Sequence, residues 1–349
     1  MSDPKLQEKI IDALKTVQDP DLHKDIVSLG FVKNLNIEGG NIKFDVELTT
    51  PACPVKEQLR TECETKVKDI DGVEQVDVNM TAVVRSTEHS QPVLPGVKNI
   101  IAVASGKGGV GKSTVSTNLA IALSLTGARV GLMDADIYGP SIPQMMGIPI
   151  SSPKVGAENK FFPHEKYGLK VVSAAFLTKQ GQPLMLRGPM LGGIIQQFLQ
   201  NVEWGELDVL LVDVPPGTDK ISRLLELVPS LHQMLLVTTP SETSRFVVAK
   251  SVRLAREAEV GTVALVANMT GHTCPSCGHV SELFAGDGAR RLQDEADVPL
   301  WADIPFDPRL GADTDAGTPL VTTDPTAPAS RALFALADRV ATQMEARDS

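Results

Sequence analysis

The sequence contains few basic residues and no run of them. Its 349 residues include 33 Lys and Arg against 43 Asp and Glu, so the formal net charge is −10. Nucleic-acid binders neutralise phosphates with clustered basic side chains, so we expect no nucleic-acid partner. No uninterrupted apolar stretch reaches about 18 residues, the length of a membrane span. The N-terminal Met-Ser-Asp-Pro-Lys also lacks the apolar core of a signal peptide. We therefore expect a cytoplasmic protein with no membrane partner.

Cysteine is scarce as well. Four Cys residues in a chain of this length do not make a disulfide framework. In a reducing compartment, closely spaced cysteines instead indicate metal-binding or redox groups. The remaining composition, 42% hydrophobic and 22% charged, is ordinary for a globular protein. The length suggests about two domains.

Residues 1–85 have the pattern of a small α+β domain. Helical spacing of apolar residues and strand-like alternation predict helices over 4–17 and 54–69 and strands over 31–37, 42–48 and 73–79. The polar segment 86–98, which contains two prolines, is typical of an inter-domain linker.

Residues 99–349 have a different pattern, in which short apolar runs alternate with helical segments. The predicted strands are 100–104, 129–133, 169–174, 208–213, 234–238, 262–267 and about 300–304, and the clearest helices are 112–126, 189–201 and 243–258. This alternation predicts an α/β domain built on a doubly wound, mostly parallel sheet. Functional loops in such a sheet lie at the carboxyl ends of the strands.

A phosphate-binding loop follows the first of these strands. The segment fits G-x-x-x-x-G-K-[ST], and the residues expected to bind nucleotide are Gly106, Lys107, Gly108, Gly109, Val110, Gly111, Lys112, Ser113 and Thr114. The glycines let backbone N–H groups surround phosphates at a helix N-terminus. We expect Lys112 to reach the β- and γ-phosphates and Ser113 to bind Mg²⁺.

Carboxylates follow two of the predicted strands. The strand 208–213 ends in Asp213, as in a Walker B motif whose Asp holds Mg²⁺. Asp134 and Asp136 follow the strand 129–133. We predict that Asp136 orients the attacking water. Asp134 either supports the metal from its second coordination shell or caps the following turn.

Cys274 and Cys277 form a C-x-x-C pair in a predicted loop after the strand 262–267. Two thiolates can bind one side of a metal centre, whereas clusters and structural zinc usually need four ligands. A symmetric dimer would supply the other two. The spacing fits a bridging iron–sulfur cluster, a bridging zinc ion or a redox dithiol alike. His272 and His279 flank the pair and could complete a zinc site within one chain.

The nucleotide and cysteine motifs resemble those of one family. Lys107-Gly-Gly-Val-Gly-Lys112-Ser113 is similar to the deviant Walker A motif of the MinD/Mrp/NifH/ArsA group. Asp134-Ala-Asp-Ile-Tyr-Gly-Pro-Ser, Asp213-Val-Pro-Pro-Gly-Thr, and Asn268-Met followed by Cys-Pro-Ser-Cys-Gly resemble the Mrp/Nbp35 (ApbC-like) iron–sulfur carrier ATPases. The family's second motif usually continues Gly/Ser-Asp, whereas this chain has Asp219-Lys220.

The resemblance implies what the residues alone leave open. It implies an ATPase with ATP and Mg²⁺, and a homodimer in which the catalytic Lys107 reaches the partner's nucleotide. It also implies that Cys274 and Cys277 hold a bridging [4Fe–4S] cluster, and that Asn268 contacts adenine rather than capping a turn. The partners would be apo iron–sulfur proteins and a cluster donor. The alternative is a zinc-bridged targeting or positioning ATPase of the MinD/ArsA group.

The N-terminal unit carries a second resemblance. Asp19-Pro-Asp and Thr49-Thr-Pro-Ala-Cys-Pro are similar to the MIP18/DUF59 domain, which is linked to iron–sulfur assembly. Cys53 precedes a predicted helix N-terminus, where the dipole favours the thiolate. It is either an accessory thiol for a transient cluster or a small buried residue. Cys63 lies on the apolar face of the same helix, and we expect it in the core.

Overall fold

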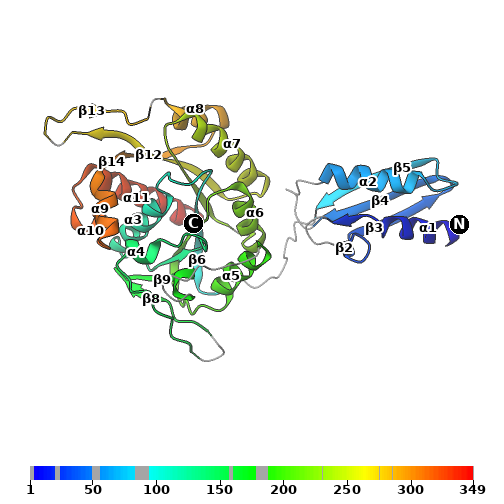
Figure 1. The fold of residues 1–349 in the computed structure, drawn as a ribbon, viewed down its shortest axis with the longest axis horizontal. Coiled ribbons are helices and arrows are strands. Elements are labelled where there is room, and N and C mark those ends of the chain that lie inside the picture. The colour runs from blue at the N-terminus through cyan, green and yellow to red at the C-terminus, as the bar shows by residue number, and fades with distance from the viewer. Residues whose placement is uncertain are drawn as a thin grey trace. The chain divides into compact units, whose positions relative to one another are not determined.

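The computed structural model describes residues 4–19, 24–48, 56–82, 94–156, 160–177, 188–229, 231–274, 276–284 and 286–348. The chain divides into two compact units, one within residues 1–90 and one within 91–349 (Figure 1). The predicted linker ends too late, because its last residues, Val97 and Lys98, already belong to a strand of the second unit. None of the described helices is both long enough and apolar enough to span a membrane.

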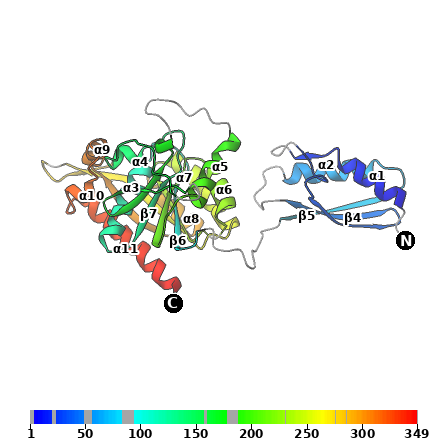
Figure 2. The ribbon, with the colours of Figure 1, turned by 90° about the horizontal axis from the view of Figure 1, so that it is seen from below.

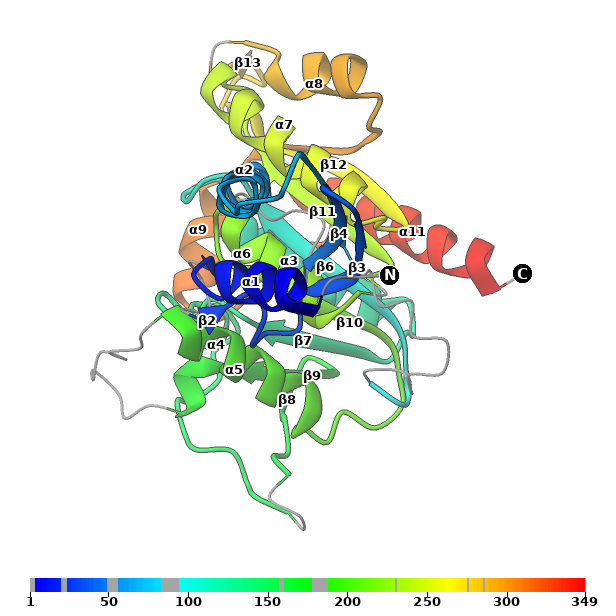
Figure 3. The ribbon, with the colours of Figure 1, turned by 90° about the vertical axis from the view of Figure 1, so that its right-hand side faces the viewer.

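The N-terminal unit is a three-stranded sheet covered on one face by two helices (Figures 2 and 3). Its elements are α1 (Pro4–Leu14), β1 (Gln18–Asp19), β2 (Lys24–Asp25), β3 (Val32–Glu38), β4 (Asn41–Leu48), α2 (Lys56–Lys68) and β5 (Gln75–Ala82). β3 and β4, which match two of the predicted strands, form an antiparallel hairpin, and β5 pairs parallel to β4. Alternate residues of β4, such as Phe44 and Val46, are buried against Ile10 of α1 and Leu59 of α2.

Cys63 of α2 is fully buried in this core, which confirms its predicted place. Burial raises the pKa of its thiol to about 12. A thiol with such a pKa stays protonated and unreactive near neutral pH.

The second unit is built on a nine-stranded sheet. Its path is β13-β12-β11-β6-β10-β7-β9-β8, and β14 also pairs with β12. The strands are β6 (Val97–Ser105), β7 (Val130–Asp134), β8 (His164–Lys166), β9 (Leu169–Ser173), β10 (Leu207–Asp213), β11 (Gln233–Thr238), β12 (Thr262–Thr273), β13 (Val280–Ser281) and β14 (Leu300–Phe306). Only the short strands β8 and β13 pair antiparallel in the described sheet. The predicted mostly parallel sheet is confirmed.

Helices cover both faces of this sheet (Figure 2). They are α3 (Lys112–Leu125), α4 (Ile142–Met145), α5 (Gly188–Gln200), α6 (Thr218–Leu227), α7 (Glu242–Glu257), α8 (Gly288–Ala296), α9 (Pro308–Asp315), α10 (Leu320–Thr323) and α11 (Pro328–Asp348), with a short 3₁₀ helix at Ala174–Leu177. Ile101 and Val103 of β6 pack on the side of α3 and α11. Their neighbours Ile100 and Ala102 pack on the side of α5, α6 and α7. Two apolar cores on opposite faces make the sheet doubly wound.

One predicted strand is too short. The prediction ends it at residue 267, before the polar Asn268, but β12 continues to Thr273. The extension is held by pairing, because Asn268 lies opposite Ile304, and Thr273 lies opposite Val280 of β13. Figure 1 shows this end of β12 and β13 as a hairpin that projects from the body of the sheet. The predicted loop that carries the C-x-x-C pair is therefore the turn of this hairpin.

Candidate nucleotide site and cysteine hairpin

The phosphate loop connects β6 to α3 at the carboxyl edge of the sheet. Gly109 and Gly111 have φ angles of +80° and +82°, which favour glycine. A Cβ atom on Gly111 would also collide with the side-chain amide of Asn268. At the start of the loop, a Cβ on Gly106 would lie 2.7 Å from the Val247 side chain of α7. Close packing therefore requires glycine at Gly106 and Gly111, and backbone conformation favours it at Gly109 and Gly111.

Lys112 and Asp213 form a buried ion pair. The Nζ atom of Lys112 lies 2.6 Å from Oδ2 of Asp213, and both side chains are almost completely buried. The Ser113 hydroxyl donates to the same Oδ2 at 2.7 Å. Strand β10 thus places Asp213 directly beneath the first turn of α3, as the sequence predicts.

The oxygens of Ser113 and Asp213 fit a magnesium site. Mg²⁺ prefers hard oxygen ligands and retains several waters, and these two oxygens lie 2.7 Å apart. The Lys112 ammonium bonds to both of them here, 2.6 Å from Asp213 Oδ2 and 3.1 Å from Ser113 Oγ. The lysine would have to turn towards phosphates for both predicted roles to be filled at once.

Sequence reasoning missed a hydroxyl at this site. The Ser116 Oγ lies 2.5 Å from Oδ1 of Asp213, and the residue has no exposed surface. Its signal was its spacing, because a residue three places after Ser113 lies on the same face of the helix.

Asp134 is a fully buried carboxylate at the end of β7. It lies opposite Asp213 in the β7–β10 pairing. Its Oδ2 accepts from the Ser173 hydroxyl at 2.9 Å, and its Oδ1 accepts from the Asp136 backbone N–H at 3.2 Å. Burial, followed by the charge of Asp213, raises the pKa of Asp134 to about 7. These bonds agree with the capping alternative, because Asp134 accepts from backbone N–H groups of the turn that follows it. Its Oδ2 also accepts a longer bond from the Ile142 N–H, at 3.4 Å.

Asp136 itself is partly exposed. Its Oδ1 accepts from the Gly139 backbone N–H at 3.1 Å, so its carboxylate caps the turn that follows β7. Among the described residues, no hydrogen bond joins its side chain to Lys112 or Asp213. Its role in orienting water stays a prediction.

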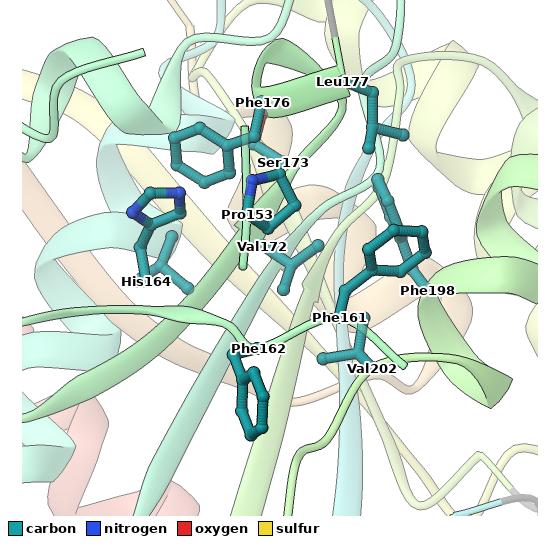
Figure 4. A pocket seen from close by; sticks show the side chains of 11 residues that line it. Pro153, Phe161, Phe162, His164, Val172, Ser173, Phe176, Leu177, Phe198 and Val202 are labelled. Carbon is teal, nitrogen blue, oxygen red and sulfur yellow. The ribbon is translucent and has the colours of Figure 1, made fainter. Parts of the chain in front are cut away.

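Ser173, at the end of β9, also lines a small pocket. Figure 4 shows aromatic side chains around this pocket. The lining residues are Pro153, Phe161, Phe162, His164, Val171, Val172, Ser173, Phe176, Leu177, Phe198 and Val202. The rings of His164 and Phe176 lie 4.1 Å apart. Ser173 is the polar link from this wall to the buried Asp134.

Asn268 lies inside β12 rather than at its end, so its predicted position was wrong. Its side-chain N–H donates to the Val110 carbonyl at 2.9 Å, and the side chain is buried. The amide therefore braces the phosphate loop. Its contact with adenine stays a prediction.

Lys107 lies in the phosphate loop, and Asp219 and Lys220 lie in the first turn of α6. Lys107 is partly exposed, and its ammonium group makes none of the hydrogen bonds or ion pairs found in the described parts of the chain. Lys220 bonds to Asp219 at 2.6 Å in the first turn of α6. This ion pair lowers the pKa of Asp219. The role of Lys107 across a dimer stays a prediction.

The two cysteines lie in the tight turn between β12 and β13. The Cys274 N–H donates to the His279 carbonyl at 2.8 Å, and the Gly278 N–H donates back to the Cys274 carbonyl at 2.9 Å. Cys274 is partly exposed and Cys277 is exposed. Nearby N–H groups of Ser276 and Cys277 lower the pKa of Cys274. The turn therefore favours the thiolate form that binds metal.

No set of three or more His, Cys, Asp or Glu side chains within the described residues could hold a metal ion. The single-chain zinc site with His272 and His279 is thus not formed. His272 instead packs against Phe306, with ring centroids 5.8 Å apart. Cys53, the possible accessory thiol, lies outside the described residues.

Comparison with known proteins identifies the chain's relatives. The family described as the NUBPL iron-transfer P-loop NTPase matches residues 96–341, and the family described as iron–sulfur cluster assembly protein matches residues 7–78. The chain belongs to the NUBPL iron-transfer P-loop NTPase family. The resemblance seen in its motifs is confirmed.

Individual relatives agree. An iron–sulfur cluster carrier protein of Deinococcus radiodurans is 40% identical over 98% of this chain and 97% of its own length. A nucleotide-binding protein of Archaeoglobus fulgidus, solved in complex with ADP, is 35% identical with a TM-score of 0.57, over 64% of this chain and 88% of that one. The cell division ATPase MinD of Pyrococcus furiosus is 24% identical, with a TM-score of 0.54 over 70% of this chain and 99% of that one. The last likeness shows the fold alone.

Proposed function

We propose that this chain is an iron–sulfur cluster carrier that holds a [4Fe–4S] cluster between the two subunits of a homodimer. The observation that carries the proposal is the cysteine hairpin, which presents two thiols at a projecting turn. Within the described residues no third ligand lies near them. A two-fold axis would bring two more thiols and complete the four-ligand set of a cluster.

The chain binds and hydrolyses ATP, and hydrolysis follows the chemistry of P-loop NTPases. Lys112 leaves Asp213 and neutralises charge on the β- and γ-phosphates, while the loop's N–H groups bind phosphate oxygens. Ser113 and Asp213 would hold Mg²⁺, which would supply charge stabilisation. Lys107 adds positive charge from the partner subunit, and Asp136 orients the attacking water.

Nucleotide binding gates cluster transfer through β12. The Asn268 side chain donates to the Val110 carbonyl of the phosphate loop, and Cys274 lies six residues later, immediately after the end of the same strand. A shift of the loop on ATP binding or hydrolysis would therefore move the base of the hairpin. The recipients are apo iron–sulfur proteins, and a cluster donor loads the dimer in the cytoplasm.

Anaerobic reconstitution tests the proposal. The wild-type chain should take up about four iron and four sulfide per dimer and absorb broadly near ~400 nm. The Cys274→Ala/Cys277→Ala variant should take up neither. Cys63→Ala is the matched control, because Cys63 is buried in the other unit, and it should load like the wild type.

Three outcomes would overturn the proposal. Equal iron in the wild type and the double variant would exclude the hairpin thiols. Cluster retained in the double variant but lost in Cys53→Ala would move the site to the N-terminal unit. A colourless dimer that binds about one zinc ion would favour the zinc-bridged targeting ATPase.

A further inference from the structure

Ser116 is a buried hydroxyl that none of the roles above uses. It lies on α3, one turn beyond Ser113, and has no exposed surface. Its Oγ lies 2.5 Å from Oδ1 of Asp213 and 3.0 Å from the Lys112 carbonyl. A hydroxyl has one hydrogen to donate. The nearer, charged carboxylate is the stronger acceptor, so Ser116 donates to Asp213.

The two oxygens of Asp213 have separate partners. Oδ2 receives the Lys112 ammonium and the Ser113 hydroxyl, whereas Oδ1 receives Ser116. The final torsion of an aspartate side chain is broad and easily turned. With a donor fixed beneath Oδ1, the carboxylate presents Oδ2 to the phosphate loop and cannot turn without losing a charge-assisted bond.

The neighbouring carboxylate is held in the same manner. Ser173 donates to Oδ2 of Asp134, and both residues are fully buried. Asp134 and Asp213 lie side by side on adjacent strands. Each buried carboxylate at the carboxyl edge therefore has its own buried serine, and the serine under Asp213 is the one that belongs to the phosphate-binding helix.

We propose that Ser116 is a positioning residue for the magnesium site, which it serves by fixing the orientation of the Asp213 carboxylate. It touches neither nucleotide nor metal in this role. The inference rests on the proposed function only in taking Ser113 and Asp213 as the magnesium ligands. It does not depend on the cysteine hairpin or on the cluster.

The test is the effect of Mg²⁺ on ATP affinity, measured with the full chain. ATP binding is titrated in excess Mg²⁺ and again in EDTA. The readout is the dissociation constant in EDTA divided by the dissociation constant in Mg²⁺. Removing a group that orients a metal ligand typically weakens metal binding about 10–100-fold. Ser116→Ala should lower the ratio by at least about tenfold, while ATP affinity in EDTA stays within about twofold of the wild type.

Three further variants make the test specific. Ser116→Thr keeps the hydroxyl and should restore most of the ratio. Ser116→Cys keeps the size of the side chain but donates weakly, so it should resemble Ser116→Ala. Ser251→Ala is the matched control. Ser251 is also a fully buried serine on a helix of this unit, but its hydroxyl has no partner in the described part of the chain.

An unchanged ratio in Ser116→Ala and Ser116→Cys would overturn the inference. So would a loss of stability in Ser116→Ala with the wild-type ratio, because that pattern marks a merely structural hydrogen bond. If Ser116→Ala does not fold, Ser116→Cys and Ser116→Thr decide the question between them. Failure of the cluster proposal would appear separately, as absence of iron in the wild type.

Discussion

At the scale of single residues, Asp134 and Asp213 show how environment divides two similar side chains. Both are fully buried, and they lie opposite each other on adjacent strands. Asp213 has the Lys112 ammonium beside it, whereas Asp134 receives bonds only from the neutral hydroxyl and N–H donors of the described residues. Burial beside a like charge favours the protonated acid. The pKa of Asp134 accordingly rises from 3.8 to about 7.

This shift predicts a pH dependence of stability. Between about pH 4 and pH 7 the folded protein keeps a proton on Asp134 that the unfolded chain has released. The free energy of unfolding should therefore fall as pH rises through this window, by up to about 1.4 kcal/mol per pH unit. Asp134→Asn cannot titrate and should show a flatter profile. Urea unfolding between pH 5 and pH 8 measures the difference.

Tryptophan fluorescence suits this measurement, because Trp204 and Trp301 both lie in the unit that contains Asp134. Asp208→Asn is the control. Hydrogen bonds from Arg129 lower the pKa of Asp208, so this group titrates below the window and its loss should leave the slope unchanged. Equal slopes in Asp134→Asn and the wild type would contradict the assignment.

The cysteines should differ in reactivity for physical reasons that the structure provides. In the folded protein at pH 8, iodoacetamide should modify Cys274 and Cys277 at the exposed turn but leave Cys63 untouched, since its thiol is buried and has a pKa of about 12. Mass spectrometry of digested samples before and after unfolding checks this. Modification of Cys63 at the rate of Cys277 in the folded protein would contradict it.

Sequence motifs predicted the residues whose chemistry depends on local spacing. Lys112, Ser113 and Asp213 meet as expected, because a phosphate loop and a Walker B strand occupy fixed places in this sheet. Ser116 and Ser173 were missed, because serine is common on helices and strands and its role here depends on contacts across 97 and 39 residues. Such contacts are set by tertiary packing, and the helical spacing of Ser113 and Ser116 shows only that they share a face, not what that face contacts.

At the scale of elements, the junction between the phosphate loop and β12 is the tightest part of the site. Gly111 has a φ of +82°, and its Cα faces the side-chain amide of Asn268. A side chain at this position would meet both backbone strain and a collision. The loop and the strand that leads to the cysteine hairpin are therefore fitted to each other.

Gly111→Ala should destabilise the second unit by at least about 2 kcal/mol, through the strained φ and the collision together. Gly109→Ala is the matched control, because its φ is +80° but nothing lies within 4 Å of an added Cβ. It should cost about 1 kcal/mol. Urea unfolding followed by tryptophan fluorescence gives both values.

A double-variant cycle separates collision from strain. Asn268→Ala removes the colliding amide, so Gly111→Ala/Asn268→Ala should lose less stability than the sum of the single variants, by about 0.5–3 kcal/mol. Strict additivity would show that Gly111 and Asn268 are not in contact.

Sequence patterns predicted most elements of the fold to within a few residues, because apolar runs mark buried parallel strands. The end of β12 was not predictable in this manner. From Asn268 onwards its residues are polar or small except Met269, and pairing with β14 and β13 holds them in a strand. The partners on β14 lie more than 30 residues away, and such pairing cannot be read from local alternation.

At the scale of the whole molecule, the chain combines an iron-transfer P-loop NTPase region with a region that matches the iron–sulfur cluster assembly family. One chain brings Lys112, Ser113 and Asp213 together, and Lys107 is predicted to act on the partner's nucleotide. The cysteine pair has half of the ligands that a cluster needs. In the proposed homodimer the second subunit supplies both the other two thiols and Lys107. The cluster should therefore be bound only by the dimer.

Native mass spectrometry of the anaerobically reconstituted protein tests this claim most directly. We predict one species with the mass of two 37.3 kDa chains plus a single [4Fe–4S] cluster. Removal of the cluster with a chelator, without nucleotide, should shift the population towards single chains. A single chain that carries a complete cluster, or a dimer whose added mass is one zinc ion, would contradict it.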